Sequence, residues 1–152
     1  MRIVKGILYW AVSWTWGLPT TFLGAIVALV VLITGHKPKR FHYNIYFEVG
    51  NGWGGVSMGA FFFVSRNASN RLKQHEAGHS IQNLMWGILF PFVIGIPSVI
   101  RYFWHTYLIR VRGRDPHSLP YWDSVWFEAQ ATRLGKRYFA AKEKEEVILS
   151  PC

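Results

Sequence analysis

The chain has 152 residues, of which 51% are apolar and 17% aromatic, a share typical of a domain that meets lipid. Lys and Arg total 17 against 8 Asp and Glu, and many basic residues directly follow apolar runs, which suits lipid headgroups better than nucleic acid. We therefore expect a lipid bilayer as a partner and no nucleic acid. The single cysteine, Cys152, excludes an intrachain disulfide and a thiolate metal site, so a bound zinc ion must use His and carboxylate ligands.

Residues 1–36 are predicted to form a membrane anchor helix. The stretch 7–34 contains no Lys, Arg, Asp or Glu, and about 20 apolar residues are enough to cross a bilayer. Pro19 leaves two interpretations: one kinked helix, or a Trp-rich interfacial stretch followed by a helix that opens at Pro19. A cleaved signal peptide fits less well, because the apolar run is longer than a usual signal core and no small-residue cleavage site follows it.

Residues 37–141 are expected to form one domain, which starts with a β-hairpin over residues 41–64. Two runs rich in aromatic and β-branched residues lie on either side of a Gly/Asn cluster at 50–55. This pattern is typical of two strands joined by a turn. A lone hairpin is weak in water, so we expect it to pack on a helix.

Helices are predicted over residues 69–89 and 121–141, with a broken apolar segment over residues 91–111 between them. The polar stretch 67–70 offers N-cap residues for the first helix. Two prolines and a glycine interrupt the apolar segment, so we expect the chain to bend there. Residues 142–152 are expected to form a charged, loose tail.

The first predicted helix carries the sequence His-Glu-Ala-Gly-His at residues 75–79. Residues four apart share one helix face, so the imidazoles of His75 and His79 can reach one zinc ion. Glu76 lies about 100° round the helix, where its carboxylate can accept a proton from a zinc-bound water as hydroxide attacks a carbonyl. A helix with this motif after a strand-rich hairpin resembles the zincin metallopeptidases, in which a sheet edge beside the site helix holds the substrate as an added strand.

A catalytic zinc ion needs a third protein ligand and one open position. The residues that can supply this ligand are His36, His42, His105, His117, Asp123 and Glu128. Glu128 is the strongest candidate, because the stretch Trp126-Phe-Glu-Ala-Gln-Ala-Thr-Arg-Leu-Gly135 resembles the third-ligand helix of the HtpX-like membrane metallopeptidases, which belong to the Glu-ligand (gluzincin) group. Glu128, Ala131 and Gly135 match the pattern of that helix.

Several further residues are candidates for supporting roles. Thr132 stands where the HtpX-like pattern has Asp, a residue that the resemblance implies orients a ligand histidine. A threonine at this position can hydrogen-bond, but not as a carboxylate. His117 and Tyr121 precede the third-ligand helix and either donate to an oxyanion in the transition state or serve a simple loop role. Gln82 and Asn83 continue the histidine face of the first helix and either line the cleft or form a polar flank.

Together these features predict a mainly α, membrane-embedded, minimal zincin-like domain with a small β-hairpin, one transmembrane helix and a broken apolar segment. His79 and Glu128 must approach one ion, so we expect the segment 91–111 to turn back rather than cross the bilayer. Site helices placed within the membrane, as in intramembrane proteases, are the runner-up, although the partner Asp-Gly motif of those enzymes is absent. Two basic residues precede the stretch 7–34 and three follow it, which favours a cytoplasmic site in the cell membrane.

The leading hypothesis is a membrane-bound zinc metallopeptidase with Glu76 as the base and His75, His79 and Glu128 as ligands. The alternative is a non-catalytic zinc-binding membrane protein, such as a sensor or assembly factor, which Thr132 supports. A third hypothesis is a basic structural membrane protein with a chance motif, which would hold no stoichiometric metal. The substrate is a peptide or protein that the sequence does not identify.

Overall fold

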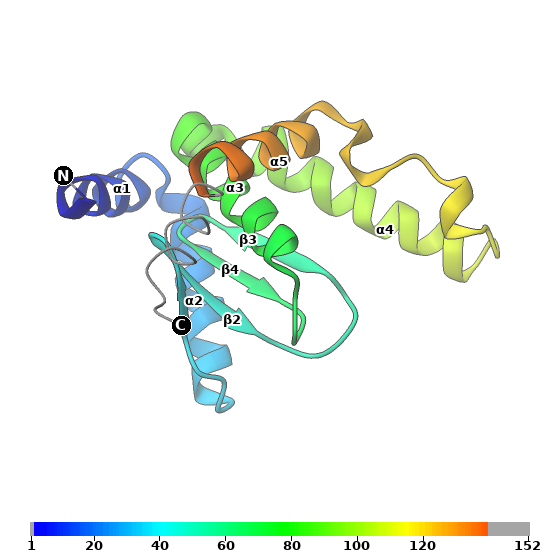
Figure 1. The fold of residues 1–152 in the computed structure, drawn as a ribbon, viewed down its shortest axis with the longest axis horizontal. Helices are drawn as coiled ribbons and strands as arrows, with labels where there is room; N and C mark the ends of the chain where they lie inside the picture. The colour runs from blue at the N-terminus through cyan, green and yellow to red at the C-terminus, as the bar shows by residue number, and fades with distance from the viewer. Residues whose placement is uncertain (1, 140–152) are drawn as a thin grey trace, which may run out of the picture.

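The computed structural model describes residues 2–139, whose helices and strands form three layers (Figure 1). The helices are α1 (Arg2–Trp14), α2 (Leu18–Ile33), α3 (Asn70–Trp86), α4 (Ile96–Arg110) and α5 (Trp126–Phe139). The strands are β1 (Lys39–Phe41), β2 (Asn44–Glu48), β3 (Gly55–Met58) and β4 (Phe61–Val64). Helix α2 covers one face of the sheet, and α3 with α5 covers the other. The prediction of a mainly α fold with a small β element is confirmed.

The sheet has the order β1-β2-β4-β3, which corrects the predicted hairpin over residues 41–64. Strands β2 and β4 are parallel neighbours, with Tyr46 opposite Phe62. Parallel strands cannot be joined by a tight turn, so the chain crosses over through β3. The tight hairpins are instead β1–β2, with His42 and Tyr43 at the turn, and β3–β4, with Gly59 and Ala60 at the turn. Strand β3 therefore forms an edge of the sheet.

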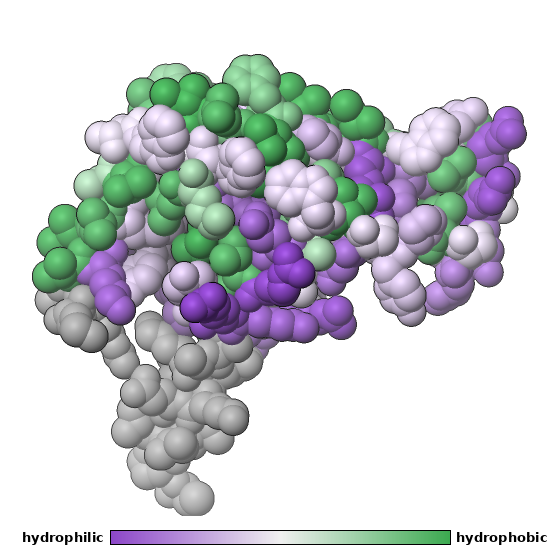
Figure 2. Space-filling view, turned by 90° about the horizontal axis from the view of Figure 1, so that it is seen from above, coloured by the Kyte–Doolittle hydropathy of each residue, from purple (hydrophilic) through white to green (hydrophobic). Residues whose placement is uncertain are grey.

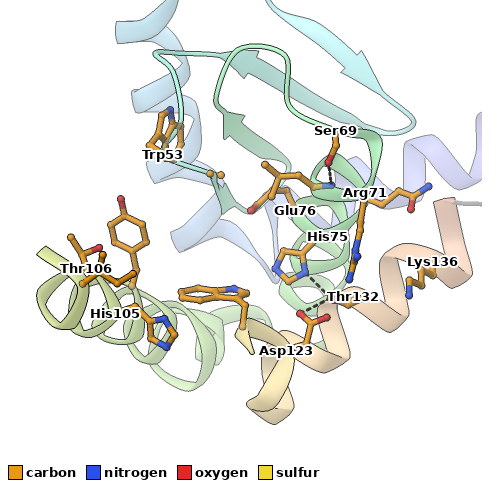
Figure 3. Close-up of a pocket in the computed structure, with 17 residues that line it drawn as sticks. Trp53, Ser69, Arg71, His75, Glu76, His105, Thr106, Asp123, Thr132 and Lys136 are labelled. Carbon is orange, nitrogen blue, oxygen red and sulfur yellow. Dashed lines mark hydrogen bonds between the residues drawn. The ribbon is translucent and has the colours of Figure 1, made fainter. Parts of the chain in front are cut away.

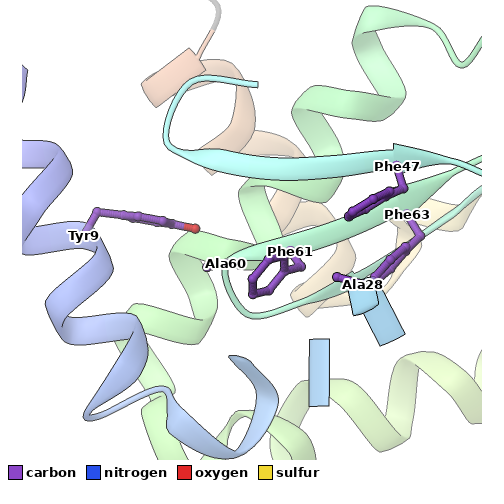
Figure 4. Close-up of a cluster of buried hydrophobic side chains, with 6 residues drawn as sticks. All are labelled: Tyr9, Ala28, Phe47, Ala60, Phe61 and Phe63. Carbon is purple, nitrogen blue, oxygen red and sulfur yellow. The ribbon is translucent and has the colours of Figure 1, made fainter. Parts of the chain in front are cut away.

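Strand β4 is buried on both faces, because its side chains alternate between the two helical layers. Phe61 and Phe63 join a cluster that includes Ala28 of α2 (Figure 4). Phe62 joins a second cluster with Ala77 of α3. A strand covered on both sides reads as a continuous apolar run, and the sequence of β4 has this form.

The predicted anchor helix over residues 1–36 is wrong as a single helix. Helices α1 and α2 meet at an angle of 96°. Pro19 lies in the first turn of α2, where its missing N–H needs no partner, so a helix starts at Pro19 as one of the two interpretations predicted, and the Trp-rich stretch before it is largely helical. Within residues 2–139 no single helix is long and apolar enough to cross a membrane, although two bent helix pairs meet that test by length and composition.

Helix α3 begins where the sequence predicts. The Ser69 side chain accepts a hydrogen bond from the Leu72 N–H and caps the helix. After α3 the chain forms a 3-10 turn at Gly87–Leu89, and Pro91 then opens a π-helical turn. This break turns the chain by 119° between the residues before and after it, as predicted for the apolar segment.

Helix α4 extends from the body of the molecule as an arm (Figure 1). Pro97 does not break it, contrary to the prediction of a broken segment over residues 91–111, because Pro97 lies in its first turn. The chain returns to α5, which begins at Trp126 rather than at residue 121, since a separate 3-10 turn and the extended Val125 precede it. The predicted tail over residues 142–152 lies outside the described residues.

Candidate metal centre

Two glycines let α3 and α5 cross at close range. A Cβ atom added at Gly78 would lie 1.9 Å from the carbonyl oxygen of Ala131, and one added at Gly135 would lie 2.1 Å from that of Gln74. No side chain tolerates such contacts, so the crossing requires glycine at both positions. The crossing places Glu128 of α5 over the histidine face of α3.

His75, His79 and Glu128 converge at this crossing. Nε2 of His75 lies 3.1 Å from Oε2 of Glu128, and Nε2 of His79 lies 3.2 Å from the same oxygen. One ligand atom from each of the three residues lies within 4.8 Å of the others. The group can therefore hold a metal ion, and Glu128 is the residue that completes it.

The Nδ1 atom of His75, the ring nitrogen that does not face Glu128, is held by two hydrogen bonds in series. His75 Nδ1 lies 2.8 Å from Thr132 Oγ1, and the Thr132 hydroxyl donates to Asp123 Oδ1 at 3.1 Å. A carboxylate only accepts, so the threonine proton points to Asp123 and its oxygen accepts the Nδ1–H of His75. Asp123 thus supplies, through Thr132, the carboxylate that position 132 lacks, and an imidazole held through its Nδ1–H can offer its Nε2 lone pair to a metal ion.

The Nδ1 atom of His79 is held by a side chain of the same helix, α3. His79 Nδ1 lies 2.7 Å from Gln82 Oε1, while Gln82 Nε2 donates to the Phe127 carbonyl oxygen and to Gln130 Oε1, both at 2.8 Å. These acceptors fix the amide, so His79 Nδ1 donates to Gln82 and its Nε2 also carries a lone pair. Two imidazole lone pairs and a carboxylate oxygen then face one another, an arrangement that a cation between them stabilises.

The Glu128 carboxyl is fully buried and held by two more donors. Ser98 Oγ donates to Oε1 at 2.6 Å, and Trp122 Nε1 donates to Oε2 at 3.0 Å. Burial by itself would raise the pKa of Glu128, but its contacts with the His75 and His79 imidazoles and the hydrogen bond from Ser98 hold this pKa well below its usual range. The carboxylate is therefore ionised and fixed toward the two imidazoles.

Glu76 is only 4% exposed, and within residues 4–139 no group forms a hydrogen bond with its carboxyl. Burial raises the pKa of Glu76 to about 7, with a smaller rise from Glu128 and an opposing effect of His75. The carboxyl faces strand β3, because a Cβ atom added at Gly55 would lie 2.6 Å from Glu76 Oε1. A buried, unpartnered carboxyl that titrates near neutral pH is suited to general base catalysis.

Two cavities, of about 510 and 940 Å³, open beside this site. The residues that line both are Trp53, Gly55, His75, Glu76, Tyr102 and Trp122. The larger cavity also reaches His79 and Glu128. Figure 3 shows the smaller one, with His75 and Glu76 between Trp53 and Asp123. The metal-ligand group therefore lies beside a space that is large enough for a ligand.

His117 and Tyr121, for which the sequence left open an oxyanion-donor role or a simple loop role, both lie away from the site. Tyr121 is 90% exposed, and His117 is exposed in a 3-10 turn at Pro116–Ser118. Neither residue lines the two cavities among the described residues. Helix α4 instead contributes Tyr102 and His105 to the smaller cavity. Nearness to Glu128 in the sequence did not indicate where these side chains lie.

The other possible third ligands lie outside the metal-ligand group. His36 hydrogen-bonds to Thr34 after α2, and the His42 ring packs against Phe139. The His105 ring packs edge-on against Trp122. These three imidazoles therefore have structural contacts of their own, and Asp123 acts through Thr132.

The two polar residues that follow the motif on α3 have different roles in the structure. Gln82 is fully buried and orients His79, whereas Asn83 is also buried but donates to Thr21 of α2. The sequence analysis missed Ser98 and Trp122, the two donors to Glu128. Neither belongs to the motifs, so the sequence carried no signal for them.

Comparison with known proteins gives no relative for this chain. No protein-family model, no curated protein and no solved structure matches it. The resemblance to the HtpX-like metallopeptidases therefore rests on two short motifs, and what it implies about activity stays a prediction. A functional assignment must come from the site itself.

Proposed function

We propose that this protein is a zinc metallopeptidase that acts at a membrane and hydrolyses peptide bonds. The observation that carries the proposal is the orientation of the two imidazoles, whose Nδ1 atoms are tied to Thr132 and Gln82 and whose Nε2 atoms face Glu128. Two imidazoles and one carboxylate, beside an open cavity, form a ligand set typical of catalytic zinc. Calcium and magnesium prefer oxygen ligands alone.

Zinc bound by His75, His79 and Glu128 would lower the pKa of a water molecule and polarise the substrate carbonyl. Glu76 lines both cavities beside His75 and has a pKa of about 7, so it can take a proton from the attacking water. The water oxygen bonds to the carbonyl carbon, the C–N bond breaks, and Glu76 passes the proton to the leaving amine. Tyr102 and His105 are the groups that can donate to the carbonyl oxygen.

A membrane location is supported by the apolar outer faces of α2 and α4. Figure 2 shows apolar residues in a broad band over one side of the molecule, with hydrophilic residues gathered on the other side and at the end of the α4 arm. The exposed large side chains on the two helices include Phe22, Leu29, Ile33, Ile100, Phe103 and Trp104. Exposed apolar surface of this extent marks contact with lipid or a partner, and the basic residues Lys37, Lys39 and Arg40 after α2 suit anionic headgroups.

The test of the proposed reaction is Glu76→Gln, compared with the parent protein after purification without added zinc. We expect both proteins to hold one zinc ion per chain, and the variant to cleave an unfolded protein substrate about a thousandfold more slowly. The matched control is Glu48→Gln, because Glu48 pairs with Lys39 and Lys73 outside both cavities. Equal cleavage by the parent and Glu76→Gln would show that the mechanism is wrong.

Removal of a ligand tests the metal site separately. His75→Ala should lose zinc and activity together, whereas His36→Ala, which removes an imidazole outside the metal-ligand group, should lose neither. Bound zinc without cleavage of any substrate would favour the alternative of a non-catalytic zinc-binding protein. A parent protein without stoichiometric zinc would favour the structural hypothesis.

A further inference from the structure

The two cavities beside Glu76 adjoin each other, because they share six lining residues that include His75 and Glu76. The site lies at their junction. An extended peptide that occupies both ends must therefore place the bond between them next to Glu76. The chemistry of each end then selects the residues on one side of that bond.

The end formed by the larger cavity is apolar. Apart from His75, Glu76, His79 and Glu128, no described residue that lines it is charged. Its walls come from α2, β3 and the segment that leads into α4, and they include Leu23, Val56, Met58, Phe92, Ile96 and Val99. A space of about 940 Å³ with such walls favours large aliphatic and aromatic side chains and disfavours charged ones.

The end formed by the smaller cavity has a cationic wall. Arg71 of α3 and Lys136 of α5 line it, and no carboxylate in the described part of the chain pairs with either one. Asp123 lines it too, but its carboxylate accepts from Thr132. Figure 3 shows Arg71 and Lys136 on the same side of the cavity as Thr132. Cations that line a cavity without a carboxylate partner among the described residues favour an anionic group on the ligand. Arg71 and Lys136 are both exposed, so this attraction is modest and is screened by salt.

Building on the proposed function, we propose that the substrate is an extended peptide with bulky apolar residues on one side of the scissile bond and an acidic group on the other. The apolar residues occupy the larger cavity between α2 and α4. The acidic group lies against Arg71 and Lys136. This class of sequence occurs where an apolar, membrane-seated segment of a polypeptide ends at an acidic flank.

Peptide binding to the Glu76→Gln protein tests the inference without any need for turnover. The probes are fluorescein-labelled 12-residue peptides that join a Leu/Phe or a Ser/Gln half to a Glu or a Lys half, each made in both orders, and the readout is fluorescence anisotropy. The Leu/Phe–Glu peptide should bind about tenfold more tightly than its Ser/Gln–Glu counterpart, because the larger cavity is apolar. It should bind about threefold more tightly than Leu/Phe–Lys, a difference that shrinks as salt is added.

Variants at the two ends assign these preferences to the cavities. Val99→Asp, at a 47% exposed position of α4, should abolish the preference for Leu/Phe, whereas Val111→Asp, 69% exposed and outside both linings, should keep it. Lys136→Glu should reverse the preference between Glu and Lys peptides. Arg133→Glu, an exposed residue on the same helix outside the linings, should not.

The outcomes separate this inference from the proposed function. Equal binding of Leu/Phe and Ser/Gln peptides would overturn the inference, including the case in which the larger cavity holds a lipid chain, while cleavage by the parent would still uphold peptidase activity. The predicted binding preferences without cleavage by the zinc-loaded parent would contradict the proposed function and leave the peptide site standing. An unchanged preference in both Val99→Asp and Lys136→Glu would also overturn the inference.

Discussion

The α3–α5 crossing and the α4 arm meet at the same site but are built differently. At the crossing, Ala77 and Ala131 are fully buried, and Gly78 brings the two backbones close together. Helix α4 has no buried residue and reaches the ligand group through Ser98. The difference teaches that the position of the ligands depends on close backbone packing, while access to them depends on a less tightly packed element.

Substitutions at the crossing should therefore have the largest effect. We expect Gly78→Ala to lower the free energy of unfolding by about 3 kcal/mol and to remove the bound zinc, because the added Cβ would lie 1.9 Å from the Ala131 carbonyl oxygen. Chemical denaturation and zinc analysis measure the two effects. Gly95→Ala, at the residue that directly precedes α4, is the control, because the nearest contact of a new Cβ there is 3.7 Å. Equal losses of stability and of zinc in both variants would show that the crossing is no more sensitive to added atoms than the segment before α4.

The relay behind His75 should have the next largest effect. Thr132→Val breaks the path from His75 to Asp123, and we expect zinc affinity to fall about 10- to 100-fold. Competition with a chelator of known affinity measures the loss. Thr34→Val, an exposed position outside the site, is the matched control and should bind zinc as the parent does. Unchanged affinity in Thr132→Val would mean that Asp123 does not support the metal site.

The pH profile tests Glu76, the proposed base on α3, whose carboxyl faces β3. Glu76 works as a base only when ionised, and burial raises its pKa to about 7. Below that pH the ionised fraction falls about tenfold per unit, so kcat/KM should rise with slope one and level off above pH 7. Measurement of kcat/KM from pH 5 to 9 checks this, and a plateau that extends down to pH 5 would contradict the role of Glu76.

Loss of the contact from the arm should have the smallest effect. Ser98→Ala removes one of several hydrogen bonds to Glu128, and we expect zinc affinity to fall about fivefold. The His75, His79 and Trp122 contacts remain. The chelator competition used for Thr132→Val detects this change. A loss larger than that of Thr132→Val would show that the arm, rather than the crossing, fixes the ligand carboxylate.

The start of α3 and the three metal-ligand candidates could be predicted from short stretches of the sequence. Ser69 marks the start of α3, and the spacing of His75 and His79 places both imidazoles on one face of it. Glu128 was predicted because the stretch around it resembles a known third-ligand helix. Gly135 belongs to the same stretch, and the close crossing of α3 and α5 explains why it is a glycine. These features depend on residues close together in the chain.

Features that depend on distant segments could not be predicted. Both Gly50–Gly55 and Gly59 are turn signals, and the alternation of residue types does not reveal that a tight hairpin forms at Gly59 and not at Gly50–Gly55. The link from Asp123 to Thr132 arises because a 3-10 turn and α5 bring the two side chains together. For His117 and Tyr121 the sequence left a donor role and a loop role open, since proximity in sequence does not fix the direction of a side chain.

X-ray absorption at the zinc edge, on protein purified without added metal, tests the central claim most directly. The account predicts one zinc ion per chain, with two imidazole nitrogens and light oxygen ligands at about 2.0–2.2 Å, and loss of that spectrum in Glu128→Ala and His75→Ala. A chain without stoichiometric zinc, or a zinc spectrum that is unchanged in both variants, would contradict it.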